Sequence, residues 1–133
     1  MTNNSQQKVL VVEDDKFLSE LVVTNLRKAN FDVTLTIDVE KAWEELEKQP
    51  LPNIIILDLI LPGTNGFEFL EQIKKDDKLK SIPVIILSNL GSEQDIEKGL
   101  SLGASAYLVK AHILPEDLVK KIKETLSKVD IKR

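Results

Sequence analysis

Five polar side chains stand directly after apolar segments of the chain. These are Glu13 and Asp14 after residues 9–12, Asp58 after 54–57, Ser88 after 84–87 and Lys110 after 104–109. A carboxylate nucleophile, an amine and a hydroxyl are the groups needed to accept a phosphoryl group and to stabilise its charge. Three carboxylates placed together repel one another. We therefore expect a hard divalent cation with oxygen ligands, Mg²⁺ above all, beside them.

The segment before Asp58 organises the rest of the chain. Residues 54–57 are four consecutive aliphatic side chains, too short and too β-branched for a helix, which indicates a strand buried on both faces of a parallel sheet. A carboxylate after such a strand is costly unless it lies at the open C-terminal edge, where ligands of α/β sheets bind. Pro62, Gly63 and Gly66 then shape a loop beside it. Asp58 is thus expected to be a functional carboxylate.

The remaining segments alternate between strand and helix patterns. Strands are expected at residues 8–13, 31–37, 54–57, 84–87 and 104–109, and the strand at 31–37 alternates in a way typical of a sheet edge. Apolar spacing predicts five helices with inward side chains that include Phe17, Leu21 and Leu100. Such alternation favours an α/β fold with a parallel sheet and helices on both faces. Because parallel strands end at one edge, the five polar groups should converge there.

Composition narrows the class of protein. The 133 residues suffice for one domain, which we place at 8–128 between a disordered tail at 1–7 and a C-terminal tail at 129–133. The net charge of −4 argues against direct nucleic-acid binding, and the lysine-rich last helix indicates a solvated face. No segment is apolar enough to insert into a membrane, and cysteine is absent. These properties predict a cytoplasmic protein.

Four separated motifs resemble the receiver domain of two-component response regulators. They are residues 12–15 (VEDD), 57–66 (LDLILPGTNG), 84–88 (VIILS) and 103–110 (GASAYLVK), and the match runs from about residue 8 to 126. The resemblance implies a flavodoxin-like, five-stranded parallel sheet of strand order 2-1-3-4-5. It also implies a signalling protein that catalyses only its own phosphorylation and dephosphorylation, and is otherwise not an enzyme.

The resemblance assigns a role to each site residue. Asp58 would accept the phosphoryl group from a sensor histidine kinase or a histidine phosphotransfer protein. Asp14, Asp58 and the backbone carbonyl of Ile60 would bind Mg²⁺, with Glu13 acting through a metal-bound water. Lys110 would pair with Asp58 or its phosphoryl group, and Ser88 would bond a phosphoryl oxygen after moving inward. Tyr107 would swing as Ser88 moves and alter the face formed by the fourth helix, the fifth strand and the last helix.

The residue after the lysine departs from the family. Receiver domains usually have a proline there, joined through a cis peptide, whereas this chain has Ala111. A cis bond to alanine would cost about 3–4 kcal/mol, against about 1 kcal/mol or less for proline. Either the surrounding structure holds the strain of a cis bond, or the bond is trans and Lys110 reaches the site in a different way. The resemblance favours the cis bond.

Individual residues also have simpler interpretations. Asp15 is expected to cap the first helix, Trp43 to anchor the core, and His112, the single histidine, to lie on the surface. Tyr107 could serve packing alone as readily as switching. Bulky side chains at Ile60 and Leu90 are expected to hinder the water that would hydrolyse a phosphoryl group.

Three other functions compete with this interpretation. Phosphatases and mutases with an aspartyl nucleophile have a second aspartate two positions later, where this chain has Ile60. A flavodoxin-like carrier would suffer repulsion between its cofactor phosphate and the acids 13–15. The strongest alternative is a receiver-like interaction module that never turns over phosphate.

With no segment after the last helix, we expect a stand-alone regulator that docks on a separate, unknown target protein or relays phosphate between histidine proteins.

Overall fold

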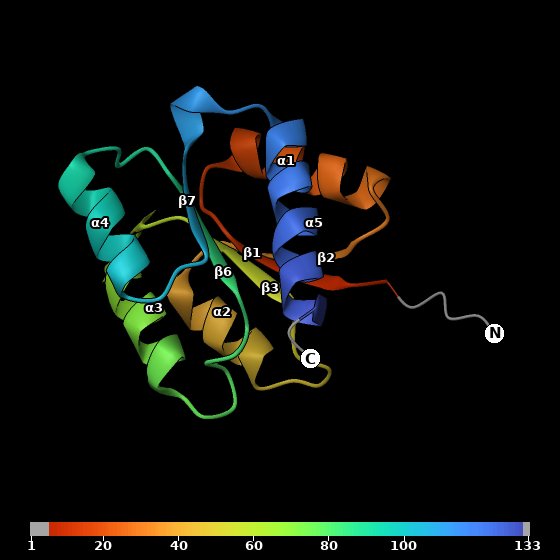
Figure 1. The fold of residues 1–133 in the computed structure, drawn as a ribbon, viewed down its shortest axis with the longest axis horizontal. Coiled ribbons are helices and arrows are strands. Elements are labelled where there is room, and N and C mark those ends of the chain that lie inside the picture. Colours follow the sequence, from red (N-terminus) through yellow and green to blue (C-terminus); the bar gives the residue numbers. More distant parts are fainter. Residues whose placement is uncertain (1–5, 132–133) are drawn as a thin grey trace.

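The computed structural model describes residues 6–131, which form a parallel five-stranded sheet covered by helices on both faces (Figure 1). The sheet strands are β1 (Lys8–Val12), β2 (Asp32–Thr36), β3 (Ile54–Leu57), β6 (Val84–Ser88) and β7 (Ala106–Val109). The helices are α1 (Lys16–Lys28), α2 (Val39–Leu46), α3 (Gly66–Lys75), α4 (Glu93–Ser101) and α5 (Pro115–Ile131). The spatial order is β2-β1-β3-β6-β7, which confirms the strand order 2-1-3-4-5 and the flavodoxin-like α/β class.

Alternate residues of the inner strands enter two separate cores. On one face, Leu10, Ile55 and Ile86 pack with the apolar side chains of α2 and α3. On the other face, Val9, Ile54 and Ile85 pack with those of α1 and α5. The strands are therefore uniformly apolar because helices cover both faces of the sheet.

Several apolar side chains expected in the core are exposed. Phe17 is 74% exposed and Leu21 is 39% exposed, so both lie on the outer side of α1, whose buried face carries Val22 and Leu26. Leu100 is 45% exposed because α4 turns the buried Gly99 toward the sheet instead.

The expectation for the edge strand β2 holds in part. Phe31 and Val33 are buried, but Leu35 and Ile37 are 39% and 56% exposed, whereas Thr36 is buried and donates its hydroxyl to the carbonyl of Val11. Period-two spacing predicted the strand correctly, but the burial of its side chains does not follow that period beyond Val33.

The ends of the folded region differ from expectation at one side. Helix α5 continues to Ile131, so residues 129–131 are helical where a tail was expected after Lys128. Most of the tail expected at 1–7, namely residues 1–5, lies outside the described residues, as do 132–133. None of the helices between residues 6 and 131 combines the length and apolar character needed to cross a bilayer.

Candidate functional site

Strand register brings the polar residues to one edge of the sheet. Val12 of β1 pairs with Leu57 of β3, so the two residues that follow, Glu13 and Asp58, stand side by side. The backbone N–H of Asp58 donates to the carbonyl of Val12 at 3.0 Å and extends the ladder by one step. On the other side of β3, Ser88 of β6 pairs with Val109 of β7, and Lys110 follows directly.

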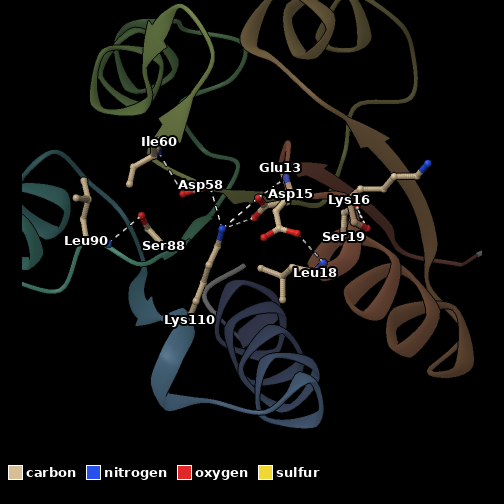
Figure 2. A network of polar contacts seen from close by, with 10 residues as sticks. All are labelled: Glu13, Asp15, Lys16, Leu18, Ser19, Asp58, Ile60, Ser88, Leu90 and Lys110. Atoms are coloured by element: carbon tan, nitrogen blue, oxygen red, sulfur yellow. Dashed lines mark hydrogen bonds and ion pairs between the residues drawn. The ribbon is translucent and has the colours of Figure 1, made fainter.

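Lys110 reaches across the sheet edge to two carboxylates (Figure 2). Its Nζ lies 2.9 Å from Oδ2 of Asp58 and 2.9 Å from Oε1 of Glu13. Glu13 and Asp58 are only 3% and 4% exposed, so they would repel each other strongly without a cation between them. The other oxygen of Asp58, Oδ1, accepts the backbone N–H of Ile60 at 3.2 Å.

Burial and charge oppose each other at these groups. Burial raises the pKa of Glu13, and the charge of Asp58 adds to the rise, against hydrogen bonds from the Asp15 N–H and from Lys110. Burial alone would lower the pKa of Lys110, but its hydrogen bonds and charge interactions with Asp58 and Glu13 outweigh that effect and raise it. Lys110 therefore stays protonated and serves as the fixed cation of the site.

An open pocket of about 350 Å³ lies above these groups. Its lining residues are Glu13, Asp14, Asp15, Asp58, Ile60, Asn89 and Lys110. One carboxylate oxygen from each of Glu13, Asp14 and Asp58 lies within 4.8 Å of the other two, and Asp14 is exposed to solvent. Three oxygen ligands at one side of a water-accessible pocket suit Mg²⁺, which keeps several of its waters when bound. The donor set fits the expected ion.

A hairpin beside β3 fixes the loop that carries Ile60. The two-residue strands β4 (Ile60–Leu61) and β5 (Thr64–Asn65) pair antiparallel across Pro62-Gly63, and Gly63 has φ = +68°, as a type II turn requires. At Gly66, an added Cβ would lie 2.6 Å from the Cα of Leu59 and 2.8 Å from the carbonyl oxygen of Asp58. Only glycine lets α3 begin this close to the backbone of Asp58, which explains the glycine at this position.

The peptide bond between Lys110 and Ala111 is trans, so the expected cis bond is wrong. Alanine lacks the ring that lowers the free-energy cost of the cis form for proline. Lys110 reaches Asp58 although the bond that follows it is trans. Residues Lys110–His112 form a single 3-10 turn, and His112 is exposed as expected.

Ser88 and Tyr107 both form hydrogen bonds with the backbone of Leu90. Ser88 is fully buried at the end of β6, and its hydroxyl accepts the backbone N–H of Leu90 at 3.3 Å (Figure 2). The half-buried Tyr107 donates its hydroxyl to the carbonyl of Leu90. Both residues therefore bind the same short segment between β6 and α4, and neither forms a hydrogen bond with Asp58 in this arrangement.

Sequence reasoning passed over Asn89 and misplaced Leu90. Asn89 lines the pocket, and its position directly after Ser88 at a strand end was the available signal. The side chain of Leu90 instead packs against the core formed with α2 and α3, so it does not line the pocket. Asp15 caps α1 by accepting the N–H of Leu18 at 3.0 Å, and Trp43 packs edge-on against Phe69, both as expected.

Comparison with known proteins assigns the family. The family model of the response regulator receiver domain matches residues 9–123. This chain belongs to that family. The receiver domain is 33% identical over 123 residues to the phosphate regulon transcriptional regulatory protein PhoB of Escherichia coli (strain K12), a match that covers 92% of this chain and 53% of PhoB. The chain thus spans about half the length of the curated relatives it matches.

Two solved structures similar to this receiver domain are of a phosphorylated and of a metal-bound protein. One is the phosphorylated cyanobacterial phytochrome response regulator RcpA, with a TM-score of 0.80 and 32% identity over 90% of this chain and 93% of that one. The other is the Mn²⁺-bound form of the response regulator Rcp1, with a TM-score of 0.75 and 32% identity over 92% of this chain and 88% of that one.

Proposed function

We propose that this receiver domain accepts a phosphoryl group on Asp58 from the phosphohistidine of a sensor kinase or phosphotransfer protein. The observation that carries the proposal is the bridging of Glu13 and Asp58 by Lys110 at the floor of an open pocket. An oxygen of Asp58 would bond to phosphorus while the P–N bond to the histidine breaks. The imidazole leaves with the bonding electron pair and takes up a proton.

The residues around Asp58 suit the charge of that transfer. Lys110 already holds Oδ2, so its ammonium group is in place to bond the phosphoryl oxygens as they arrive. The N–H of Ile60 holds Oδ1 and orients the carboxylate. Glu13, Asp14 and Asp58, together with the carbonyl of Ile60, would hold Mg²⁺, which when bound supplies positive charge against the phosphoryl oxygens. The Mn²⁺-bound Rcp1 structure supports such an ion site.

The phosphorylated form would signal through the face formed by α4, β7 and α5. Ser88 would exchange its bond to the Leu90 N–H for one to a phosphoryl oxygen, which frees the segment that Tyr107 also binds. A rearranged segment between β6 and α4 would change the position of Tyr107 on this face. We propose that a separate target protein reads the change, in the cytoplasm and without direct contact between this domain and nucleic acid.

Two exposed apolar side chains lie close in the sequence to residues that line the pocket. Phe17, at the start of α1, is 74% exposed, and Leu114, four residues after Lys110, is 59% exposed. Phe17 follows the pocket residue Asp15 by two positions, so a protein that docks over α1 could bury its side chain. Both exposed side chains favour delivery of the phosphoryl group by a docked phosphohistidine protein.

Intact mass spectrometry tests the proposal. After incubation with Mg²⁺ and a small phosphodonor such as phosphoramidate, the protein should gain the mass of one phosphoryl group, and Asp58→Asn should gain none. Asp38→Asn is a matched control, because Asp38 caps α2 through the Lys41 N–H and asparagine caps equally well. If wild type gains no mass, or if Asp58→Asn gains as much as wild type, the interaction module without phosphate turnover becomes the better assignment.

A further inference from the structure

Asn89 lines the pocket above Asp58, and the proposed function gives its side chain no part. Among the residues of the described chain that line the pocket above Asp58, it carries the single uncharged polar side chain. The others are acids, Lys110 and the apolar Ile60. A carboxamide offers both a carbonyl acceptor and two N–H donors, a combination that neither a carboxylate nor an ammonium group provides. Asn89 can therefore bind a water molecule by both of its ends.

The backbone on each side of Asn89 is anchored. The preceding residue, Ser88, is fully buried, and its hydroxyl accepts the N–H of Leu90 in a two-residue turn around Asn89. The carbonyl of Leu90 accepts the hydroxyl of Tyr107. Asn89 itself is exposed at the mouth of the pocket. These anchors hold Asn89 at the pocket before phosphorylation. Once Ser88 bonds a phosphoryl oxygen as proposed above, that bond ties the residue directly before Asn89 to the phosphoryl group, so Asn89 stays beside it.

The pocket geometry determines where water must enter. Asp58 is 4% exposed, so a phosphoryl group on it can extend only into the pocket. Hydrolysis requires a water oxygen roughly in line with the bond from phosphorus to Asp58, on the side away from the carboxylate. That side is the open mouth, where Asn89 and Ile60 lie. Side chains that orient the attacking water are one of the recurring parts of enzymes that cleave phosphoryl groups, and a carboxamide serves this purpose in GTPases.

We infer that Asn89 positions the water that hydrolyses the aspartyl phosphate, an inference that rests on the proposed function of Asp58. The water oxygen bonds to phosphorus as the bond between phosphorus and Asp58 breaks. The electron pair of that bond returns to the Asp58 carboxylate, which pairs again with Lys110. Inorganic phosphate leaves, and the proton lost by the water passes to the phosphate or to solvent. Asn89 thereby shortens the lifetime of the signal.

The decay of the phosphorylated protein tests this role. Wild type and Asn89→Ala are loaded with phosphoramidate and Mg²⁺, freed of donor by desalting, and followed by intact mass spectrometry. Loss of one water-holding hydrogen bond should slow decay of Asn89→Ala about three- to tenfold. Asn89→Gln, which keeps the carboxamide on a longer side chain, should recover part of the rate. Gln94→Ala removes an exposed carboxamide from α4 outside the pocket and should decay like wild type.

The alanine variant also separates positioning from simple obstruction. If Asn89 only covers the phosphoryl group, the smaller alanine admits more water and decay becomes faster. Decay of Asn89→Ala at or above the wild-type rate therefore overturns the inference, as does failure of Asn89→Gln to recover any rate. Absence of phosphoryl uptake by wild type is a different result, which contradicts the proposed function itself.

Discussion

Gly99 of α4 lies directly against the ring of Tyr107 in β7. A Cβ added at Gly99 would stand 2.9 Å from Cδ2 of Tyr107 and 2.6 Å from Cδ1 of the fully buried Ile86. Such distances are too short for real carbon atoms, so a side chain at this position must displace the end of Ile86, the ring of Tyr107 or the helix. The absence of a side chain at Gly99 therefore sets how closely α4 approaches the strand that carries Tyr107.

Gly99→Ala should consequently lower stability although alanine is the better helix former. Overpacking costs about 1–3 kcal/mol, against a gain of about 1 kcal/mol in helix propensity. The free energy of unfolding in urea measures the balance. Gly91→Ala is the matched control, because its new Cβ would meet Val109 at an ordinary 3.4 Å. Equal stability of Gly99→Ala and wild type would mean that Ile86, Tyr107 or α4 shifts at little cost.

The positions of the strand ends could be predicted from the sequence more reliably than the burial of side chains on the helices. The convergence of Glu13, Asp58 and Lys110 followed from the rule that parallel strands end at one edge, and that rule holds for the whole sheet. The burial of individual helix side chains was harder to predict from the sequence. The spacing of Phe17 and Leu21 marks an apolar stripe on α1, but spacing cannot say how much of that stripe a neighbouring element covers.

Local backbone and loop details were beyond the sequence for a different reason. The cis bond at Lys110 was carried over from a family in which proline follows, and alanine does not share its chemistry. Asn89 was missed because a single polar residue after Ser88 looks like any loop residue until the pocket is seen.

Magnesium should stabilise the folded protein through Asp14. One oxygen of Asp14 lies within 4.8 Å of oxygens of Glu13 and Asp58, yet Asp14 is exposed, so neutralising it leaves the ion pairs of Lys110 in place. We expect the melting temperature of wild type to rise with Mg²⁺, corresponding to about 2.7 kcal/mol at a hundredfold excess over the dissociation constant. Asp14→Asn should lose most of that rise.

The same substitution makes an opposite prediction without metal. Removing one of three crowded carboxylates should leave metal-free Asp14→Asn equal to wild type or up to about 1 kcal/mol more stable. The metal assignment would be contradicted if millimolar Mg²⁺ left the melting temperature of wild type unchanged. It would also be contradicted if Mg²⁺ raised the melting temperature of Asp14→Asn as much as that of wild type.

Tyr107 should ionise at unusually high pH. Burial raises its pKa to about 12, and the negative charges of Asp95 and Asp58 contribute. Because Tyr107 is the single tyrosine of the chain, the ultraviolet absorbance of tyrosinate reports this group alone. We expect a midpoint near 12 in the folded protein and about 10 in denaturant.

The raised pKa also fixes the direction of the alkaline stability change. The folded state holds the phenolic proton more tightly than the unfolded state, so the contribution is complete below pH 10 and is lost as pH rises toward 12. Lys110 acts in the same direction, since its pKa is also raised on folding. Tyr107→Phe should weaken the alkaline decline in the free energy of unfolding. A tyrosinate midpoint of 10 in the folded protein would show that the ring is solvated.

Ile60 should lengthen the life of a phosphoryl group on Asp58, in contrast to Asn89. Its side chain is 53% exposed and lines the pocket mouth, so it covers part of the path by which water reaches phosphorus. Ile60→Ala should therefore speed decay of the phosphorylated protein several-fold, as followed by intact mass after removal of the donor. Leu90→Ala should change decay less, because Leu90 packs against the core formed with α2 and α3 and not into the pocket. Unchanged decay in Ile60→Ala would place the rate-limiting obstacle elsewhere. A larger effect of Leu90→Ala would indicate that the segment between β6 and α4 controls water access through its backbone.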